Sequence, residues 1–203
     1  MFAGTGVNKH GLKPLRSALI VAEGCYKMIR AHGVAAMRAV ERGEVTADVE
    51  AAVEAAVLLS CLAFENGGLS IAHAMMLGLL VTRGTRHAQH GEHVAYGLLV
   101  ELAVEGCSED ELDDMTEFFQ QIGLPARLAD MGLDSPTSEE IDDLAGACFR
   151  SPHLRNVARP VLAADIAISI RRIEEWDARK GNPARDFKAE QPLEQGRPLA
   201  IQR

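Results

Sequence analysis

The stretch that most constrains the fold is LSIAHAMMLGLLVT, residues 69–82, which is apolar on almost every side. A helix without a polar face is stable only where protein covers it all round, so this stretch predicts a buried central helix. His73 is its one polar side chain between Ile71 and Val81. A buried polar group needs a partner. Two interpretations stay open: a core histidine bonded to a backbone carbonyl, or a metal ligand that requires a second ligand from elsewhere.

The rest of the chain also predicts helices. Pro14 opens a helix that should end at Gly33, and a short segment over 34–42 follows, closed by Gly43. Thr46 is a good N-cap for a helix that Gly67-Gly68 stops. Further helices are expected over 91–106, 109–121, 127–131, 139–150 and 160–176. No alternating run of strand-forming residues bounded by turn residues occurs, so the predicted fold class is all-α.

Composition sets the class of protein. Apolar residues make up 47% of the 203 residues, which is typical of a globular chain. The helical domain is predicted to span residues 1–176. Residues 177–203, rich in Lys, Arg, Gln, Pro and Gly, predict a disordered polar tail. The net charge of −8 argues against a nucleic-acid partner. No apolar run is long enough for a membrane span, and no secretory signal opens the sequence.

The four cysteines are far apart in the sequence. They are Cys25, Cys61, Cys107 and Cys148, and no C-x-x-C pair occurs among them. We interpret them as reduced core thiols of a cytoplasmic protein rather than as a structural zinc site.

Three histidines follow the central helix at every third position, in TRHAQHGEHVAYG, residues 85–97: His87, His90 and His93. His90 precedes Gly91-Glu92, where a helix should begin. The electropositive start of a helix disfavours a cation, so a metal ligand there must act with an anionic ligand. Periodicity leaves the direction of His90 open, whereas His87 and His93 are predicted to be solvated, in a loop and at a helix edge. The motifs H-E-x-x-H and G-x-S-x-G and the P-loop are absent.

The segment AFENGGLSIAHAMMLGL, followed by HAQHGEHVAYG, resembles the C-terminal half of glycerol dehydrogenases, in the iron-containing alcohol dehydrogenase superfamily. The match includes the Phe-Glu-x-Gly-Gly-Leu turn, Ala-His-Ala around His73, and His-Gly-Glu from His90. The resemblance extends over roughly residues 10–173. The chain departs from the family at Asn66, where Ser is usual, and at Met76-Leu77, where a His-Asn pair is common. The implied fold is the multi-helix C-terminal domain of the dehydroquinate synthase-like fold, without its N-terminal α/β nucleotide-binding domain.

The resemblance implies the residues of a site. His73 and His90 would be catalytic metal ligands, joined by an Asp, for a divalent ion that is zinc rather than iron; His87 and His93 would not be ligands. Phe64 would form an apolar wall of the substrate pocket. The implied reaction oxidises a polyol or another small alcohol to a ketone, such as glycerol to dihydroxyacetone, with NAD as hydride acceptor.

The same resemblance implies that parts of this machinery lie elsewhere. The family's Asp ligand lies before the point where this sequence begins, and NAD would bind only through an N-terminal nucleotide-binding half. We therefore expect the chain to be a fragment or split subunit that is inactive alone and that forms homo-oligomers. Two alternatives stay open: a non-catalytic helical oligomerisation module, and a small metal-binding protein that uses His73 and His90 with water.

Overall fold

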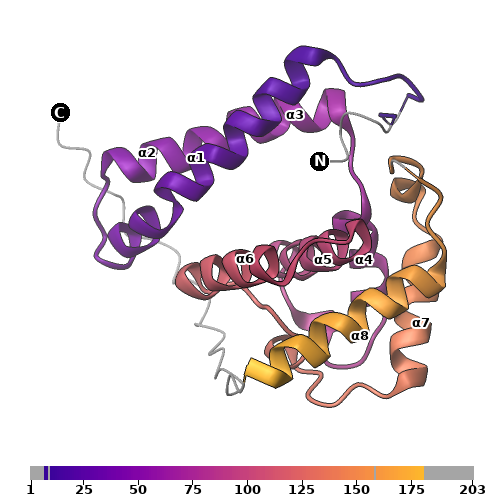
Figure 1. The fold of residues 1–203 in the computed structure, drawn as a ribbon. Helices are drawn as coiled ribbons and strands as arrows, with labels where there is room; N and C mark the ends of the chain where they lie inside the picture. Colours follow the sequence, from indigo (N-terminus) through magenta and orange to yellow (C-terminus); the bar gives the residue numbers. More distant parts are fainter. Residues whose placement is uncertain (1–6, 9, 158, 181–203) are drawn as a thin grey trace.

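The computed structural model describes residues 7–8, 10–157 and 159–180 (Figure 1). Within these ranges the regular secondary structure is helical and contains no strand, which confirms the all-α prediction. No helix among the described residues combines the length and the apolar character needed to cross a membrane. The α-helices are α1 (Arg16–Glu41), α2 (Ala47–Glu54), α3 (Ser60–Gly67), α4 (Ile71–Leu79), α5 (His90–Glu105), α6 (Glu109–Ile122), α7 (Ser138–Phe149) and α8 (Ala163–Lys180).

The first three α-helices form an arm. Figure 1 shows α1 beside α2 and α3, and these three helices stand away from most of the remaining helices. The predicted helix end at Gly33 is wrong, because α1 continues through it to Glu41. Gly33 is buried, and a Cβ there would lie 3.3 Å from the ring of Phe118 on α6. This glycine therefore provides close packing between the arm and α6 rather than a helix stop.

A π-helical turn, η2 (Ala55–Leu59), joins α2 to α3. The amide of Ser60 donates to the carbonyl of Ala55, five residues earlier, and the thiol of Cys25 on α1 donates to the same carbonyl at 3.2 Å. The predicted boundaries of this region are confirmed: Thr46 caps α2, and Gly68, with φ of 79°, ends α3. The whole segment 47–67 is thus helical, with one inserted turn of wider pitch.

The central helix α4 packs against α5 and α7. One face of α4 is completely buried, through Ile71, Ala74, Met75 and Leu79. The opposite face is open, since Leu77 is 37% exposed and Leu80 is 45% exposed. The predicted burial of residues 69–82 is therefore correct for one side of the helix only. The two helices approach so closely that a Cβ on Gly97 of α5 would overlap the carbonyl oxygen of Ala72.

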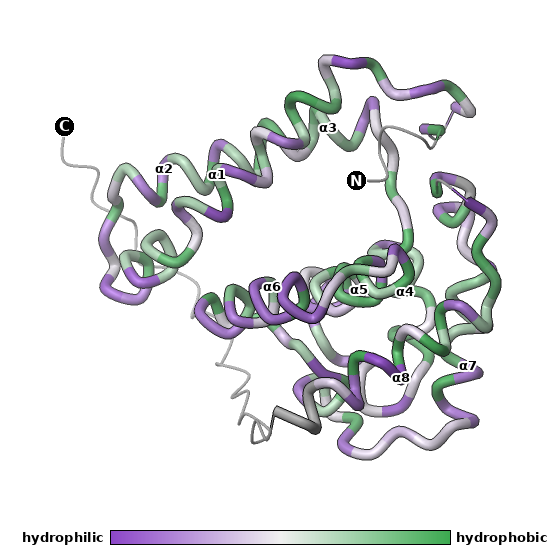
Figure 2. Tube along the Cα trace, in the orientation of Figure 1, coloured by the Kyte–Doolittle hydropathy of each residue, from purple (hydrophilic) through white to green (hydrophobic). Residues whose placement is uncertain are grey.

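The later helices follow their local signals. Figure 2 shows hydrophilic residues along much of α6, whose start is capped by Ser108. Thr137 caps α7, and its side-chain oxygen accepts a hydrogen bond from the amide of Glu140. The segment predicted as a short helix over 127–131 is a 3-10 turn, η4 (Ala129–Met131). Helix α8 continues to Lys180, into the segment predicted as a tail from 177, and residues 181–203 lie outside the described residues.

Candidate functional site

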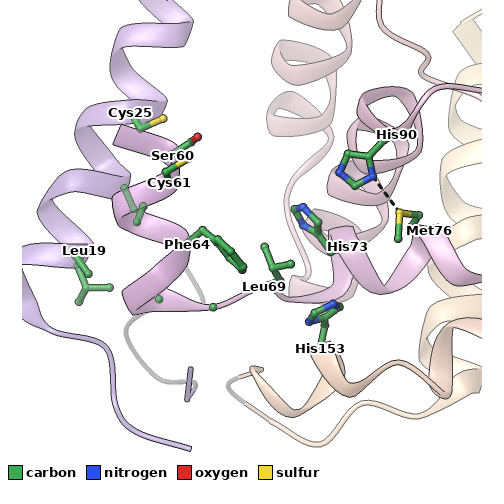
Figure 3. A pocket seen from close by; sticks show the side chains of 15 residues that line it. Leu19, Cys25, Ser60, Cys61, Phe64, Leu69, His73, Met76, His90 and His153 are labelled. Atoms are coloured by element: carbon green, nitrogen blue, oxygen red, sulfur yellow. Dashed lines mark hydrogen bonds between the residues drawn. The ribbon is translucent and has the colours of Figure 1, made fainter. Parts of the chain in front are cut away.

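His73 and His90 lie next to each other, as predicted. His73 is the third residue of α4, and His90 is the first residue of α5. Their ring centroids are 5.7 Å apart, with the rings inclined at 53° (Figure 3). The close packing of α4 on α5 thus brings two imidazoles to one point from helices separated by a 3-10 turn, η3 (Thr85–His87).

The surroundings of His73 favour its neutral form. Burial lowers its pKa to about 4, and the nearby His90 and His153 act in the same direction. Its ring is partly buried and lies against the rings of His90 and His153. The start of α4 is held by Glu101 of α5, whose carboxylate accepts from the amide of Ala72 at 2.7 Å. This bond fixes the turn from which His73 projects.

His90 lies at the exposed rim of the site. Its Nδ1 is 3.0 Å from the sulfur of Met76, so Nε2 is the nitrogen left for a ligand. Met76 occupies a position where the sequence departs from the glycerol dehydrogenase pattern. The electropositive start of α5 is opposed by Glu92, whose carboxylate accepts from the amide of Gln89 in a capping box.

The other two histidines of the trio do not face this site. His87 is exposed, as predicted, and its Nε2 accepts from Arg86 at 3.0 Å. The prediction for His93 is wrong, because it is only 1% exposed rather than solvated. Its Nε2 donates to the carbonyl of Thr85 at 2.8 Å. The 3-10 turn before α5 folds beneath the helix and covers position 93, so His93 is the core histidine bonded to a backbone carbonyl.

A cavity of about 600 Å³ lies between the arm and the helices that carry the histidines. His73, His90 and Met76 line one side, and Phe64 from α3 lies across from them (Figure 3). Phe64 is 38% exposed, and its ring faces the cavity, which is the placement expected of an apolar pocket wall.

The cysteines are only partly as expected. All four are free thiols, but only Cys148 is buried, whereas Cys61 is exposed and Cys25 is half-buried. Both Cys25 and Cys61 line the cavity wall formed by the arm. The core-thiol prediction is therefore wrong for Cys61, because the π-helical turn precedes it and the adjoining helix surface faces the cavity.

His153 is a cavity residue that the sequence reasoning missed. It lies in the 3-10 turn η5 (Pro152–Arg155), and its ring centroid is 6.4 Å from that of His73. It also lines a second cavity of about 260 Å³, which shares Phe64, Gly68 and Leu69 with the first. No motif in the sequence marks His153, because only the tertiary fold brings residue 153 to the start of α4.

The site has no preformed set of three ligands. Within the described ranges, no three side chains of His, Cys, Asp or Glu are close enough together to hold an ion in this conformation. The residues that line the larger cavity include no Asp or Glu. The arrangement therefore offers two adjacent imidazoles, those of His73 and His90, beside an apolar cavity, with the His153 imidazole on the other side of His73.

Comparisons with known proteins place the chain. No family model matches it. It is 41% identical over 142 residues to a glycolaldehyde reductase of Halobacterium salinarum, covering 70% of this chain and 39% of that protein. It is 35% identical over 167 residues to the glycerol dehydrogenase of Thermotoga maritima, covering 82% and 46%.

The structural comparison agrees. The crystal structure of glycerol dehydrogenase from Schizosaccharomyces pombe matches with a TM-score of 0.82 at 28% identity, over 91% of this chain and 49% of that one. The chain thus spans about half the length, or less, of the proteins that it matches. By sequence and by fold, it belongs to the glycerol dehydrogenase family and corresponds to the helical C-terminal domain of its members.

Proposed function

We propose that this chain is the metal- and alcohol-binding part of an NAD-dependent dehydrogenase of polyols or other small alcohols. One observation carries the proposal: His73 and His90, from two tightly packed helices, meet at the edge of an apolar cavity with their rings 5.7 Å apart. The names of the relatives, which are dehydrogenases and reductases of small hydroxyl compounds, support this choice of substrate class.

The two imidazoles fit a divalent ion. With zinc–nitrogen bonds of ~2.1 Å in tetrahedral geometry, the ring centroids of two histidines on one ion lie roughly 5 Å apart. The distance between the His73 and His90 centroids, 5.7 Å, is close to this value. Because burial and the neighbouring imidazoles lower the pKa of His73 to about 4, its ring is unprotonated at neutral pH, as ligation requires.

A divalent ion bound by this pair, which we take to be zinc rather than iron, would act as a Lewis acid toward the alcohol hydroxyl. The residues of the chain would do the rest of the positioning. Phe64 presents an aromatic face opposite the histidines, which would hold the carbon chain of the alcohol and exclude water. Glu101 fixes the first turn of α4 through the Ala72 amide and so holds His73 at a constant distance from His90.

The hydride acceptor requires a nucleotide site, and the described residues contain no βαβ unit that could form one. We propose that NAD binds to a nucleotide-binding part that acts together with this chain, on the half of the relatives' length that the chain does not match. The third ligand that the family resemblance implies, an Asp, would come from the same source. On this proposal the chain alone does not oxidise glycerol, because metal, alcohol and cofactor must be held at near-attack distance.

The test has two stages. First, zinc binding by the purified chain is measured by competition with a chromophoric chelator, for the wild type, His73→Ala and His90→Ala. The matched control is His87→Ala, an exposed histidine outside the site. We expect His73→Ala and His90→Ala, but not His87→Ala, to weaken binding. Equal binding by all four folded proteins would contradict the proposed ligand pair.

Second, NADH formation from glycerol and NAD is measured with the chain alone and after addition of the separately expressed nucleotide-binding half of the Thermotoga maritima enzyme. We expect activity only in the mixture, and its loss with His73→Ala. Zinc binding without activity in a mixture of two folded halves would favour the small metal-binding protein. Neither zinc binding nor activity would favour the non-catalytic helical module.

A further inference from the structure

Met76 contacts the exposed member of the proposed ligand pair. Its sulfur lies 3.0 Å from Nδ1 of His90, and a dashed line marks this contact in Figure 3. A thioether that only packs on an aromatic ring keeps its sulfur ~5 Å from the ring. The shorter distance, from the sulfur to one ring nitrogen, is that of a hydrogen bond. Met76 is therefore bonded to His90 rather than merely packed against it.

The chemistry of the thioether fixes the position of the proton on His90. Met76 has no hydrogen to donate from its sulfur, so it can only accept, and the donor must be the Nδ1–H group of His90. A neutral imidazole carries one N–H group, so the lone pair of Nε2 is then free. Figure 3 shows this second nitrogen on the edge of the His90 ring that is nearer to His73. The bond to Met76 thus leaves a metal-binding nitrogen facing the other ligand.

The backbone of α4 holds the sulfur in place. Met75 and Leu79, which flank Met76 in the helix, are completely buried. His73 and Met76 are three residues apart and share one face of α4. His90, by contrast, begins α5 at the exposed rim of the site. One face of α4 therefore carries both a proposed ligand, His73, and the group that orients the other ligand.

We propose that Met76 is a positioning residue of the metal site, which fixes the ring angle and the tautomer of His90 so that Nε2 faces the ion. This inference rests on the proposed function. The second ring nitrogen of a metal-binding histidine commonly donates to an acceptor that orients the ring, and loss of this acceptor weakens metal binding by about 10- to 100-fold. Of the described residues that line the cavity, none is an Asp or Glu that could accept instead.

Position 76 is also one where the sequence departs from the glycerol dehydrogenase pattern, in which His is common. An imidazole at this position could accept from His90 or donate to it, because its own tautomer can change. It could also carry a positive charge beside the ion. Methionine accepts only and is never charged, so it selects a single tautomer of His90.

The experiment compares three variants with the wild type. Met76→Leu keeps an apolar side chain of similar size but removes the acceptor, and Met76→Gln replaces the sulfur by an amide oxygen that can accept. Met37→Leu is the matched control, because Met37 is exposed on α1 and does not line the cavity. Nitrogen-15 NMR of the metal-free proteins reports the tautomer of neutral His90, and chelator competition reports the zinc affinity.

We expect neutral His90 of the wild type to carry its proton on Nδ1. In Met76→Leu the proton should move to Nε2, the tautomer that imidazole prefers in water, because the acceptor for Nδ1–H is gone. The zinc affinity of this variant should fall by about tenfold, the lower end of the range, because a thioether is a weak acceptor. Met76→Gln should recover most of the zinc affinity, and Met37→Leu should change neither quantity.

The outcomes separate this inference from the proposed function. If Met76→Leu keeps either the His90 tautomer or the zinc affinity of the wild type, Met76 is a packing residue and only this inference is overturned. If the wild type does not bind zinc, or if His73→Ala and His90→Ala bind it as the wild type does, the proposed function fails as well. Circular dichroism and the melting temperature of each variant show that the fold is intact.

Discussion

Substituting Gly97 by alanine should separate the two helices that carry His73 and His90. Gly97 lies in the middle of α5, where that helix crosses α4. A Cβ built on Gly97 would overlap the carbonyl oxygen of Ala72 and would lie 3.0 Å from its carbonyl carbon. The obstacle is backbone rather than the end of a flexible side chain. The strain can therefore be relieved only if α5 moves away from α4.

The magnitude follows from two opposing effects. Overpacking a tight contact costs up to about 3 kcal/mol, and the upper end applies here because backbone must shift. Replacing glycine by alanine inside a helix returns about 1 kcal/mol. The net loss in the free energy of unfolding is therefore about 2 kcal/mol. For a chain of this size, that loss lowers the melting temperature by roughly 4–8 °C.

The matched control is Gly146→Ala in α7. A Cβ on Gly146 would have no neighbour within 4 Å, so only the gain in helix propensity should remain. Both variants are measured by urea denaturation followed by circular dichroism, and by zinc competition. We expect Gly97→Ala to be destabilised and to bind zinc more weakly, and Gly146→Ala to be slightly stabilised with unchanged zinc binding. Equal stabilisation of the two variants would refute the close helix contact and the argument built on it.

Three further predictions concern buried titratable and polar groups. Burial raises the pKa of Glu101 above its ordinary value of 4.5, so the folded state holds this proton to higher pH than the unfolded state does. The free energy of unfolding of the wild type should therefore fall as the pH rises from 4.5 toward the raised pKa. Glu101→Gln should lack that fall and should be more stable than the wild type at neutral pH. If denaturant titrations give the same pH dependence for the variant and the wild type, this prediction is contradicted. His93→Ala should lower the free energy of unfolding by about 3 kcal/mol, because it leaves a cavity and an unpaired backbone carbonyl. Substitution of the exposed His87 by alanine should change it by less than about 0.5 kcal/mol. Coinciding thermal melts of the two variants would contradict the buried role of His93. Cys61, which is exposed, should react with a thiol reagent in the native state, while Cys148, whose pKa burial raises to about 12, should react only on unfolding; mass spectrometry of partly labelled protein checks the order.

Local signals explain the helix boundaries that the sequence predicts correctly. Thr46, Gly68 and Ser108 act within one turn of their own position, through a side-chain cap or a positive φ. Such effects are visible in a short window of sequence. Gly33 carries the same local signal as a helix stop, yet α1 passes through it because Phe118, far along the chain, packs on it. The missed helix end is thus a tertiary effect.

The predictions about the site also succeeded where the sequence carried a motif and failed where the tertiary fold decided the outcome. The resemblance of the motifs around His73 and His90 to glycerol dehydrogenases implied that these two side chains meet, and their ring centroids are 5.7 Å apart. The role of His93 depended on how the 3-10 turn before α5 folds beneath the helix, which its neighbours in sequence do not reveal. His153 enters the cavity only because α7 and the turn after it pack on α4. No short-range pattern could have selected that residue.

The π-helical turn over Ala55–Leu59 makes the length of this segment as important as its composition. An α-helix advances by about 100° per residue, so one inserted residue puts α3 out of phase with α2 by that angle. Deleting one residue from 55–59 would allow a single regular helix, with better backbone geometry, but would rotate Phe64 and Cys61 off the cavity wall. The segment can therefore accept many substitutions and still form the pocket. The gain or loss of a single residue would instead rotate α3, so that another face of this helix would be turned toward the histidines.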